Sequence, residues 1–340
     1  MAPCYLHYCE ELHWQKDEKL VKQLKDANVK ALADFEKGIE DATANEGDTE
    51  VRAALLKKAE YLCKIGDKEA ALSQMRLVAD KPGTIGARID LAFLHLRLGL
   101  FFMDHDLIQR NLKIAQDLID EGGDWDRKNR LKVYRGVYSM AIRDLKKAAD
   151  LFLDTVATFT SYELMDFPQF VTYSVLCGIL SLKRPDFRKK VKHNPEIVEA
   201  LHGLPIIREF VHSFYDSHYE MFFKRLADVE QILKYDRFLC EHYRYYVREA
   251  RILAYSQLLS SYRSLTLDYM AKAFGVSTDF IDDELSRFIS AGRLSCKIDR
   301  MNMIVETTRP DTKNFQYQTI IKQGDLILNR IQKLGRVVNV

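Results

Sequence analysis

Long apolar runs, paired cysteines and an excess of charge of one sign are all missing from this 340-residue sequence. No stretch of about 18 uncharged apolar residues occurs, and no basic segment followed by an apolar one opens the chain, which argues against membrane spanning and secretion. With 51 basic and 49 acidic side chains, the net charge of +2 is too small for the long-range field of a nonspecific nucleic-acid binder. The six cysteines are scattered without a CxxC pair, as is typical of reduced, intracellular thiols.

Motifs of catalysis and of metal binding are also missing. The sequence contains no HExxH, no GxSxG, no P-loop and no dinucleotide fingerprint. His212 and His218 in HSFYDSHYE are six residues apart and fall on different faces of a helix. We therefore predict a protein that is not an enzyme, with no catalytic residue, no cofactor-binding residue and no metal ligand.

The composition is that of an ordinary folded protein, with 47% hydrophobic and 29% charged residues. At this length we expect two domains or one extended array. Apolar residues at helical spacing predict one amphipathic helix over residues 17–44, which ends in the turn residues NEGDTE.

A helical hairpin is predicted over LLKKAEYLCKIGDKEAALSQM, residues 55–75. Its layout resembles a tetratricopeptide repeat, with small residues Ala59 and Ala71 where two helices approach and Gly66-Asp67 at the turn. A degenerate copy follows in RLKVYRGVYSMAIRDLKKAADLF, and a third turn is expected at DHD, residues 104–106. Turns near positions 66, 105 and 143 give a period of roughly 40, which is typical of helical repeats that stack into a solenoid.

After residue 162 the helices continue through proline breaks at Pro185, Pro195 and Pro205. From residue 261 the order is a short helix, a turn at Gly275, a second helix capped by Ser277 and an apolar-alternating hairpin, which is the order of a winged helix. A two-stranded hairpin leaves backbone groups unpaired, so its edge is a candidate interface. The predicted interface residues of this wing are Leu294, Cys296, Ile298, Ile304 and Val305.

A final helix is predicted from about Thr312 to Val338, after the polar linker around Pro310. Its apolar positions repeat at alternating steps of four and three residues, which forms one seam along the helix in coiled-coil fashion. Because a seam needs a partner, we predict that this helix is an assembly element. The seam contains Gly324 and the predicted interface residues Ile320, Ile327, Ile331, Leu334 and Val338.

Three long segments, IDEGGDWDRKNRLKVYRGVYSMAIRD, LFLDTVATFTSYELMDF and HYRYYVREARILAYSQLLSSYRSLTLDYMAKAFGV, together resemble the PCI-domain family of subunits in the 26S proteasome lid. The resemblance covers essentially the whole chain. It implies a mostly all-α fold: TPR-like helical repeats over 1–161, a PCI domain over 162–308, and a linker with a bundle helix over 309–340. The PCI domain would consist of a helical part, 162–260, and a winged helix with a small β-hairpin wing, 261–308.

For function, the resemblance implies a scaffold subunit of the proteasome regulatory particle that supports ATP- and ubiquitin-dependent protein degradation through assembly. The implied partners are other lid subunits, with PCI-domain neighbours at the winged helix and several chains in a C-terminal helical bundle. Cytoplasm and nucleus are the implied locations. Members of the family usually carry an N-terminal extension that is absent here, with a shortened isoform and an incomplete sequence as open alternatives.

Two alternatives stay open at the level of sequence: a scaffold like subunit 1 of the COP9 signalosome, and a nucleic-acid-binding PCI protein. The second helix of the winged helix carries Asp279, Asp282, Asp283 and Glu284 against Arg287, which argues against reading of the major groove. We interpret the cluster Asp282-Asp283-Glu284 as helix-capping charges at the start of this helix. The basic segment from Lys183 to Lys192 is either solvated, a contact for an acidic partner or an RNA patch.

Overall fold

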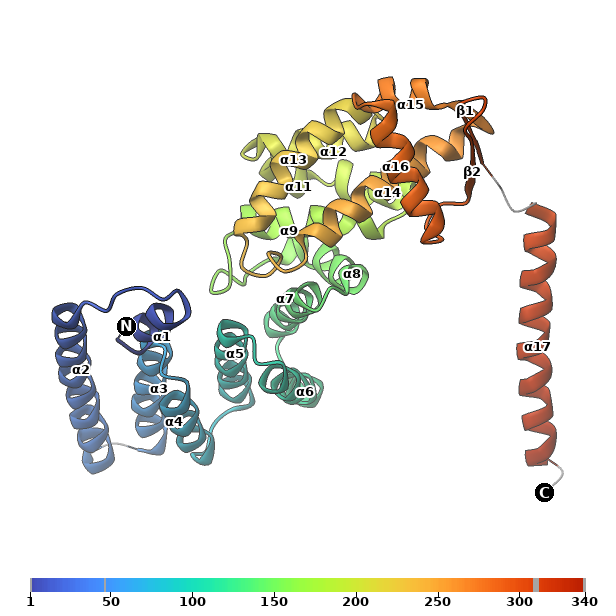
Figure 1. Ribbon diagram of the computed structural model, residues 1–340. Helices are drawn as coiled ribbons and strands as arrows, with labels where there is room; N and C mark the ends of the chain where they lie inside the picture. Colours follow the sequence, from blue (N-terminus) through green and yellow to red (C-terminus); the bar gives the residue numbers. More distant parts are fainter. Residues whose placement is uncertain (1, 46, 308–311, 339–340) are drawn as a thin grey trace. The chain divides into compact units, whose positions relative to one another are not determined.

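The computed structural model describes residues 2–45, 47–307 and 312–338, and the chain forms two compact units, 1–200 and 201–340. Helices dominate both units, and a small sheet lies in the second (Figure 1). The predicted fold class, helical repeats followed by a winged helix and a C-terminal helix, is confirmed. The boundary between these two units, at residue 200, lies further along the chain than the predicted boundary between the helical repeats and the PCI domain, at residue 161. That boundary stays a prediction.

The first unit is a succession of helices joined by short turns (Figure 1). Its elements are α1 (Ala2–Glu11), α2 (Glu18–Asn45), α3 (Asp48–Ile65), α4 (Lys68–Asp80), α5 (Ile85–Phe102), α6 (His105–Gly122), α7 (Trp125–Ala141), α8 (Leu145–Thr155), η1 (Val156–Thr158), α9 (Phe167–Ser181), α10 (Arg184–Phe187) and η2 (Arg188–Lys192). Helix α11 (Pro195–His202) lies at the division.

The predicted hairpin at residues 55–75 is confirmed as α3 and α4. Gly66 ends α3 in the left-handed conformation, φ 81°, which costs glycine nothing because it has no β-carbon. Asp67 then caps α4 by accepting a hydrogen bond from the backbone N–H of Ala70. Ala59 and Ala71 are completely buried between the helices, in a core that includes Met75.

The same turn recurs in the next two pairs, α5/α6 and α7/α8. Asp104 and Asp144 cap α6 and α8, so the capping aspartates at 67, 104 and 144 are 37 and 40 residues apart, close to the predicted period. The residue before each cap has a positive φ, although Met103 and Arg143 replace the glycine. Non-glycine residues adopt this conformation at a cost of about 1–2 kcal/mol, so the surrounding helix packing must impose it.

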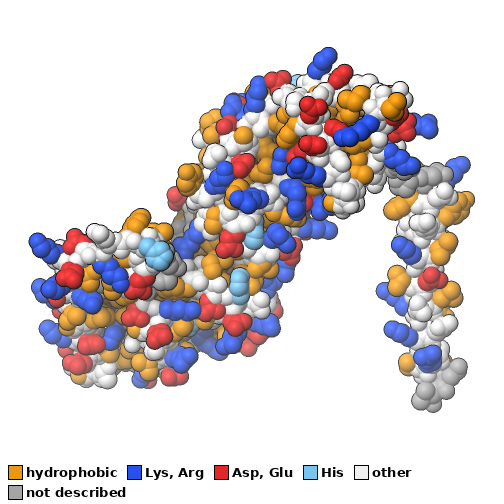
Figure 2. Space-filling view, viewed as in Figure 1, with side chains coloured by type: hydrophobic (Ala, Val, Ile, Leu, Met, Phe, Trp, Pro, Cys, Tyr) orange, Lys and Arg blue, Asp and Glu red, His pale blue; other side chains and the backbone are white. Residues whose placement is uncertain are grey.

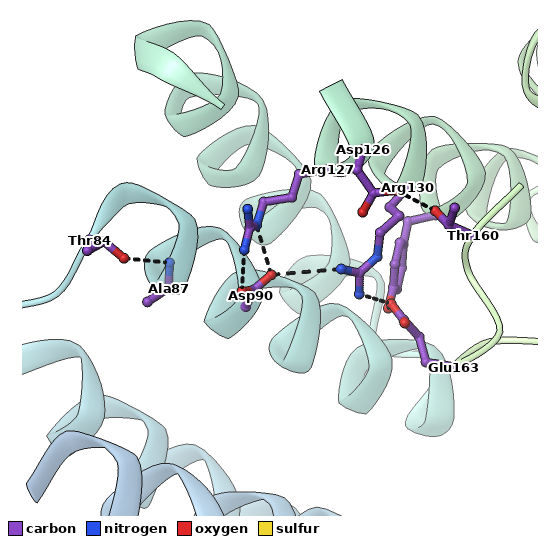
Figure 3. Close-up of polar contacts among 9 residues, drawn as sticks. Thr84, Ala87, Asp90, Asp126, Arg127, Arg130, Thr160 and Glu163 are labelled. Carbon is purple, nitrogen blue, oxygen red and sulfur yellow. Dashed lines mark hydrogen bonds and ion pairs between the residues drawn. The ribbon is translucent and has the colours of Figure 1, made fainter. Parts of the chain in front are cut away.

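Polar contacts join α7 to α5 and to the segment after α8 (Figure 3). The Arg127 guanidinium donates two hydrogen bonds to the Asp90 carboxylate, at 3.1 and 2.9 Å, in a bidentate pair. Arg130 approaches the same carboxylate and also pairs with Glu163. The Glu163 carboxylate further accepts a hydrogen bond from the Tyr134 hydroxyl at 2.8 Å. These contacts hold α7 against α5 and against the segment after α8.

The second unit contains the helices that lead into the winged helix. Its elements are α12 (Pro205–Tyr215), α13 (Tyr219–Tyr235), α14 (Tyr243–Ser261), β1 (Ser264–Thr266), α15 (Leu267–Phe274), α16 (Thr278–Ser290), β2 (Cys296–Asp299), β3 (Ile304–Thr307) and α17 (Thr312–Val338). The predicted proline breaks are helix starts: Pro185, Pro195 and Pro205 stand in the first turns of α10, α11 and α12, where proline's missing N–H is no loss.

Aromatic rings form the core beneath the winged helix. The ring of Phe274 in α15 meets that of Tyr255 in α14 edge-on, with centroids 4.7 Å apart, and Phe223 of α13 packs against both. Gly275 ends α15 at φ 68°, and Ser277 caps α16 by accepting a hydrogen bond from the N–H of Phe280, as predicted. Two of the four tyrosines of α14, Tyr246 and Tyr255, are buried in the core, and Tyr243 and Tyr245 are partly exposed.

Candidate assembly interface

The wing is part of a three-stranded antiparallel sheet with the order β1-β3-β2. We expected a two-stranded hairpin, and the structure adds β1, a strand of three residues before α15. Leu265 of β1 pairs with Val305, and the Thr307 N–H donates to the Arg263 carbonyl at 2.9 Å. So short a strand carries too little alternation to be recognised by pattern.

Because β3 is the central strand, its backbone N–H and C=O groups form hydrogen bonds with β1 on one side and with β2 on the other. The bonds from Thr307 to Arg263 and from Leu267 to Met303 direct the odd-numbered residues of β3 toward β1. The even-numbered residues then face β2. The predicted interface residues Ile304 and Val305 therefore have no open strand edge, and the Val305 side chain is completely buried.

β1 and β2 are the two edge strands of this sheet, and β2 is the longer one. The ladder pairs Lys297 with Glu306 and Asp299 with Ile304, so the backbone groups of Lys297 and Asp299 face β3. The N–H and C=O groups of Cys296 and Ile298 then point away from the sheet, where another strand could pair with them. The side chains of Leu294 and Cys296 are buried in the chain's own core. These two residues can contribute to an interface through their backbone only.

The tip of the wing is held in a defined shape. The Asp299 carboxylate accepts hydrogen bonds from the backbone N–H groups of Met301 and Asn302 and from the Asn302 side chain. Arg300 pairs with Asp282 of α16 at 2.6 Å, which ties the tip to the helix. Met301 is 92% exposed on this fixed turn. Met301 was not among the predicted interface residues, although the flexible side chain of an exposed methionine suits contact surfaces.

The carboxylates of α16 have partners other than those we expected. Only Asp279 lies in the first turn, where the helix dipole stabilises negative charge. Glu284 is buried, accepts a hydrogen bond from the Tyr255 hydroxyl at 2.7 Å and pairs with Arg251 at 2.7 Å. The capping interpretation was therefore wrong for Asp282 and Glu284, which connect α16 to the wing and to α14. Burial, together with the Glu284 charge, raises the pKa of Tyr255, so its hydroxyl remains a donor.

The C-terminal helix α17 occupies the predicted residues, Thr312–Val338. Its seam residues Ile320, Ile327, Ile331, Leu334 and Val338 are between 55% and 73% exposed. Ile321 and Leu328, which the sequence analysis left out of the seam, flank it and are equally exposed. Orange side chains accordingly recur along the helix drawn in red (Figures 1 and 2). The linker around Pro310 lies outside the described residues.

One face of α17 is apolar and the opposite face is charged. At 3.6 residues per turn, Lys322, Asp325, Lys333 and Arg336 project from the side opposite the seam. Gly324 lies within the seam, and a β-carbon there would meet nothing within 4 Å. An amphipathic helix of this kind, 27 residues long, presents an apolar face that another helix can cover.

Within the described residues, no group of three or more histidine, cysteine, aspartate or glutamate side chains is arranged to hold a metal ion. His212 and His218 lie in separate places, one in α12 and one at the start of α13. None of the described helices is both long and apolar enough to cross a membrane.

The fold defines a class: a protein of helical repeats that ends in a PCI-type winged helix. Residues 226–309 match the PCI domain, and residues 17–190 match the family described as 26S proteasome subunit RPN7. Residues 316–338 match the 26S proteasome regulatory subunit RPN7/PSMD6 C-terminal helix, which is α17. The chain belongs to this family of proteasome regulatory subunits.

Two relatives from the proteasome match this chain over its full length. The 26S proteasome non-ATPase regulatory subunit 6 of Dictyostelium discoideum is 46% identical over 340 residues, which cover 100% of this chain and 89% of the relative. The subunit 6 homolog of Arabidopsis thaliana is 48% identical, with 100% and 88% covered. The COP9 signalosome complex subunit 1 of Arabidopsis thaliana is only 28% identical, over 58% of this chain and 45% of its own. The proteasomal alternative is therefore favoured over the signalosomal one.

Proposed function

We propose that this chain is a non-catalytic scaffold subunit of the 26S proteasome lid, which supports ATP- and ubiquitin-dependent protein degradation by holding other subunits in place. The observation that carries the proposal is the exposed apolar seam of α17. Burial of each large aliphatic side chain contributes about 1.5–3 kcal/mol, so three or four of them can decide whether a helical bundle forms. The cytoplasm and nucleus are the proposed locations.

The proposed partners are other lid subunits, in two modes. In the first mode, helices of several chains cover the seam of α17. In the second, a neighbouring PCI domain adds a strand to β2, through the outward backbone groups of Cys296 and Ile298. The two surfaces would bind in different ways: the seam of α17 would bury apolar side chains, and the edge of β2 would form backbone hydrogen bonds.

The decisive experiment compares the tagged full-length chain with its Ile331→Asp variant, by mass spectrometry of the proteins that co-purify. A buried carboxylate in the seam should abolish recovery of lid subunits, because an unpaired charge in an apolar interface costs several kcal/mol. Asn329→Asp is the matched control, since it introduces the same charge on the other face of α17 and should assemble normally.

Thermal unfolding of the isolated chain completes the test. If α17 serves assembly alone, Ile331→Asp leaves the stability of the isolated chain unchanged. A loss of several kcal/mol in the isolated chain would mean that the seam packs on the chain's own PCI domain, and recovery of lid subunits at the normal level would contradict the scaffold role of α17.

A further inference from the structure

We infer that the basic segment between Lys183 and Lys192 is a binding site for an acidic, extended segment of a partner protein. The segment forms α10 followed by the single π-helical turn η2, with no break between them. Its nine residues from Arg184 span roughly 12 Å at about 1.5 Å per residue. The cations gathered over this length are Lys183, Arg184, Arg188, Lys189, Lys190 and Lys192.

Two buried anchors fix the segment to the first unit. Phe187 and Val191 are four residues apart and both are buried, and Val191 packs against α9 near Gly178. The backbone N–H of His193 donates to the Arg188 carbonyl at 3.1 Å and closes the turn. Arg188, Lys189 and Lys190 stand between the anchors and are all exposed. The positive charges are therefore presented to solvent on an ordered backbone.

Three lysines of this segment have no carboxylate partner among the described residues. Lys183, Lys189 and Lys190 are exposed, and none of them forms an ion pair with any described residue. By contrast, Lys58, Lys68 and Lys224 each pair with a carboxylate. Like charges within about one Debye length, roughly 10 Å at 0.1 M salt, repel one another. A partner of opposite charge would remove this repulsion, which gives the site its chemical selectivity.

The structure favours an acidic protein segment over a nucleic acid. Single-stranded nucleic acids bind to grooves in which aromatic rings stack on the bases. Phe187, the aromatic residue of this segment, is 2% exposed and offers no ring face to a base. In an extended peptide, side chains on one face recur about every 6.6–6.8 Å. This spacing is close to that of cations one helical turn apart, about 5.4 Å along the axis. Alternate aspartates or glutamates can thus meet successive cations.

A fluorescein-labelled decaglutamate peptide is the probe, and its anisotropy is measured with the full chain at about 50 and about 300 mM salt. The charge-reversed double variant Lys189→Glu with Lys190→Glu should weaken binding at least tenfold at the lower salt, because two charges change sign and the net charge of the site falls by four units. The matched control is Lys146→Glu with Lys147→Glu, which reverses two exposed lysines of α8 and should weaken binding less than twofold.

Equal losses of peptide affinity in the two double variants would contradict the proposed site, because the net charge of the chain alone would then explain binding. So would the absence of peptide binding by the parent chain, or an oligouridine of equal charge that binds more tightly through the same two lysines. Circular dichroism melts of both variants should match the parent, since all four side chains are exposed. The Ile331→Asp chain should bind the peptide normally, so failure of this site and failure of α17 assembly are distinguishable.

Discussion

Gly136 of α7 lies against the ring of Phe152 of α8 so closely that a β-carbon at residue 136 would come within 2.5 Å of the ring. Phe152 cannot move aside easily, because it is completely buried and its ring meets that of Phe170 edge-on at 5.3 Å. The absence of a side chain at residue 136 is thus what allows α7 and α8 to pack against each other as a helical hairpin.

Gly136→Ala should destabilise the chain by about 1–3 kcal/mol, as overpacking does in other cores. The measurement is the urea midpoint of unfolding. Gly38→Ala in α2 is the control: nothing lies within 4 Å of a β-carbon there, so alanine should be neutral or stabilising by up to about 1 kcal/mol. Equal midpoints for the two variants would mean that α7 and α8 have room to separate.

Ala148→Leu in α8 should also lower the melting temperature, because Ala148 is completely buried where two helices cross. Three added carbon atoms would force the helices apart at a cost of about 1–3 kcal/mol. Lys146→Leu on the exposed side of the same helix is the control and should leave the melt within about 0.5 kcal/mol of the parent. An unchanged melt for Ala148→Leu would show that this crossing is loose.

Ile298→Pro should weaken assembly while the PCI domain stays folded. The Ile298 N–H points off the open edge of β2, so its removal breaks no bond of the chain's own sheet but blocks strand addition. Lys297→Pro makes the informative contrast, because the Lys297 N–H faces β3 and its loss should destabilise the wing itself. Co-purification with lid subunits and thermal melts measure the two effects, and normal assembly of Ile298→Pro would rule out edge pairing.

Cys63 should react slowly with iodoacetamide in the folded chain. It lines a cavity of about 320 Å³ with Leu94 and Phe101, and burial raises the pKa of the Cys63 thiol to about 11. The thiolate fraction at pH 8 is then about one in a thousand, and the alkylation rate should rise about tenfold per pH unit up to pH 10. Mass spectrometry of the peptide that contains Cys63 gives the rate, and a plateau below pH 9.5 would contradict the raised pKa.

The raised pKa of Cys63 makes the free energy of unfolding depend on pH in the alkaline range. Above the unfolded pKa of about 9, the unfolded chain releases the Cys63 proton while the folded chain keeps it. The unfolded state then binds fewer protons, so the free energy of unfolding falls as pH rises between about 9 and 11. Cys63→Ser should remove this contribution to the alkaline loss of stability.

The repeats and the winged helix were predictable from the sequence because their signals are local. Gly66-Asp67 and Ser277 mark helix ends by their own backbone and capping chemistry, and the seam of α17 follows from spacing alone. The turn near position 143 was predicted where it lies, whereas the turn expected at residues 104–106 begins one residue earlier, at Met103, a residue that does not favour a positive φ by itself.

The sequence alone therefore determined the fold class, the helical register and the resemblance to lid subunits. Tertiary structure alone decided which strands lie at the sheet edges, because the addition of the short strand β1 makes β3 central and leaves β1 and β2 at the edges. It also decided the role of Glu284, a carboxylate whose partners Tyr255 and Arg251 lie about thirty residues away along the chain. Such pairings depend on which helices meet in space, a long-range property that no local pattern of residues encodes.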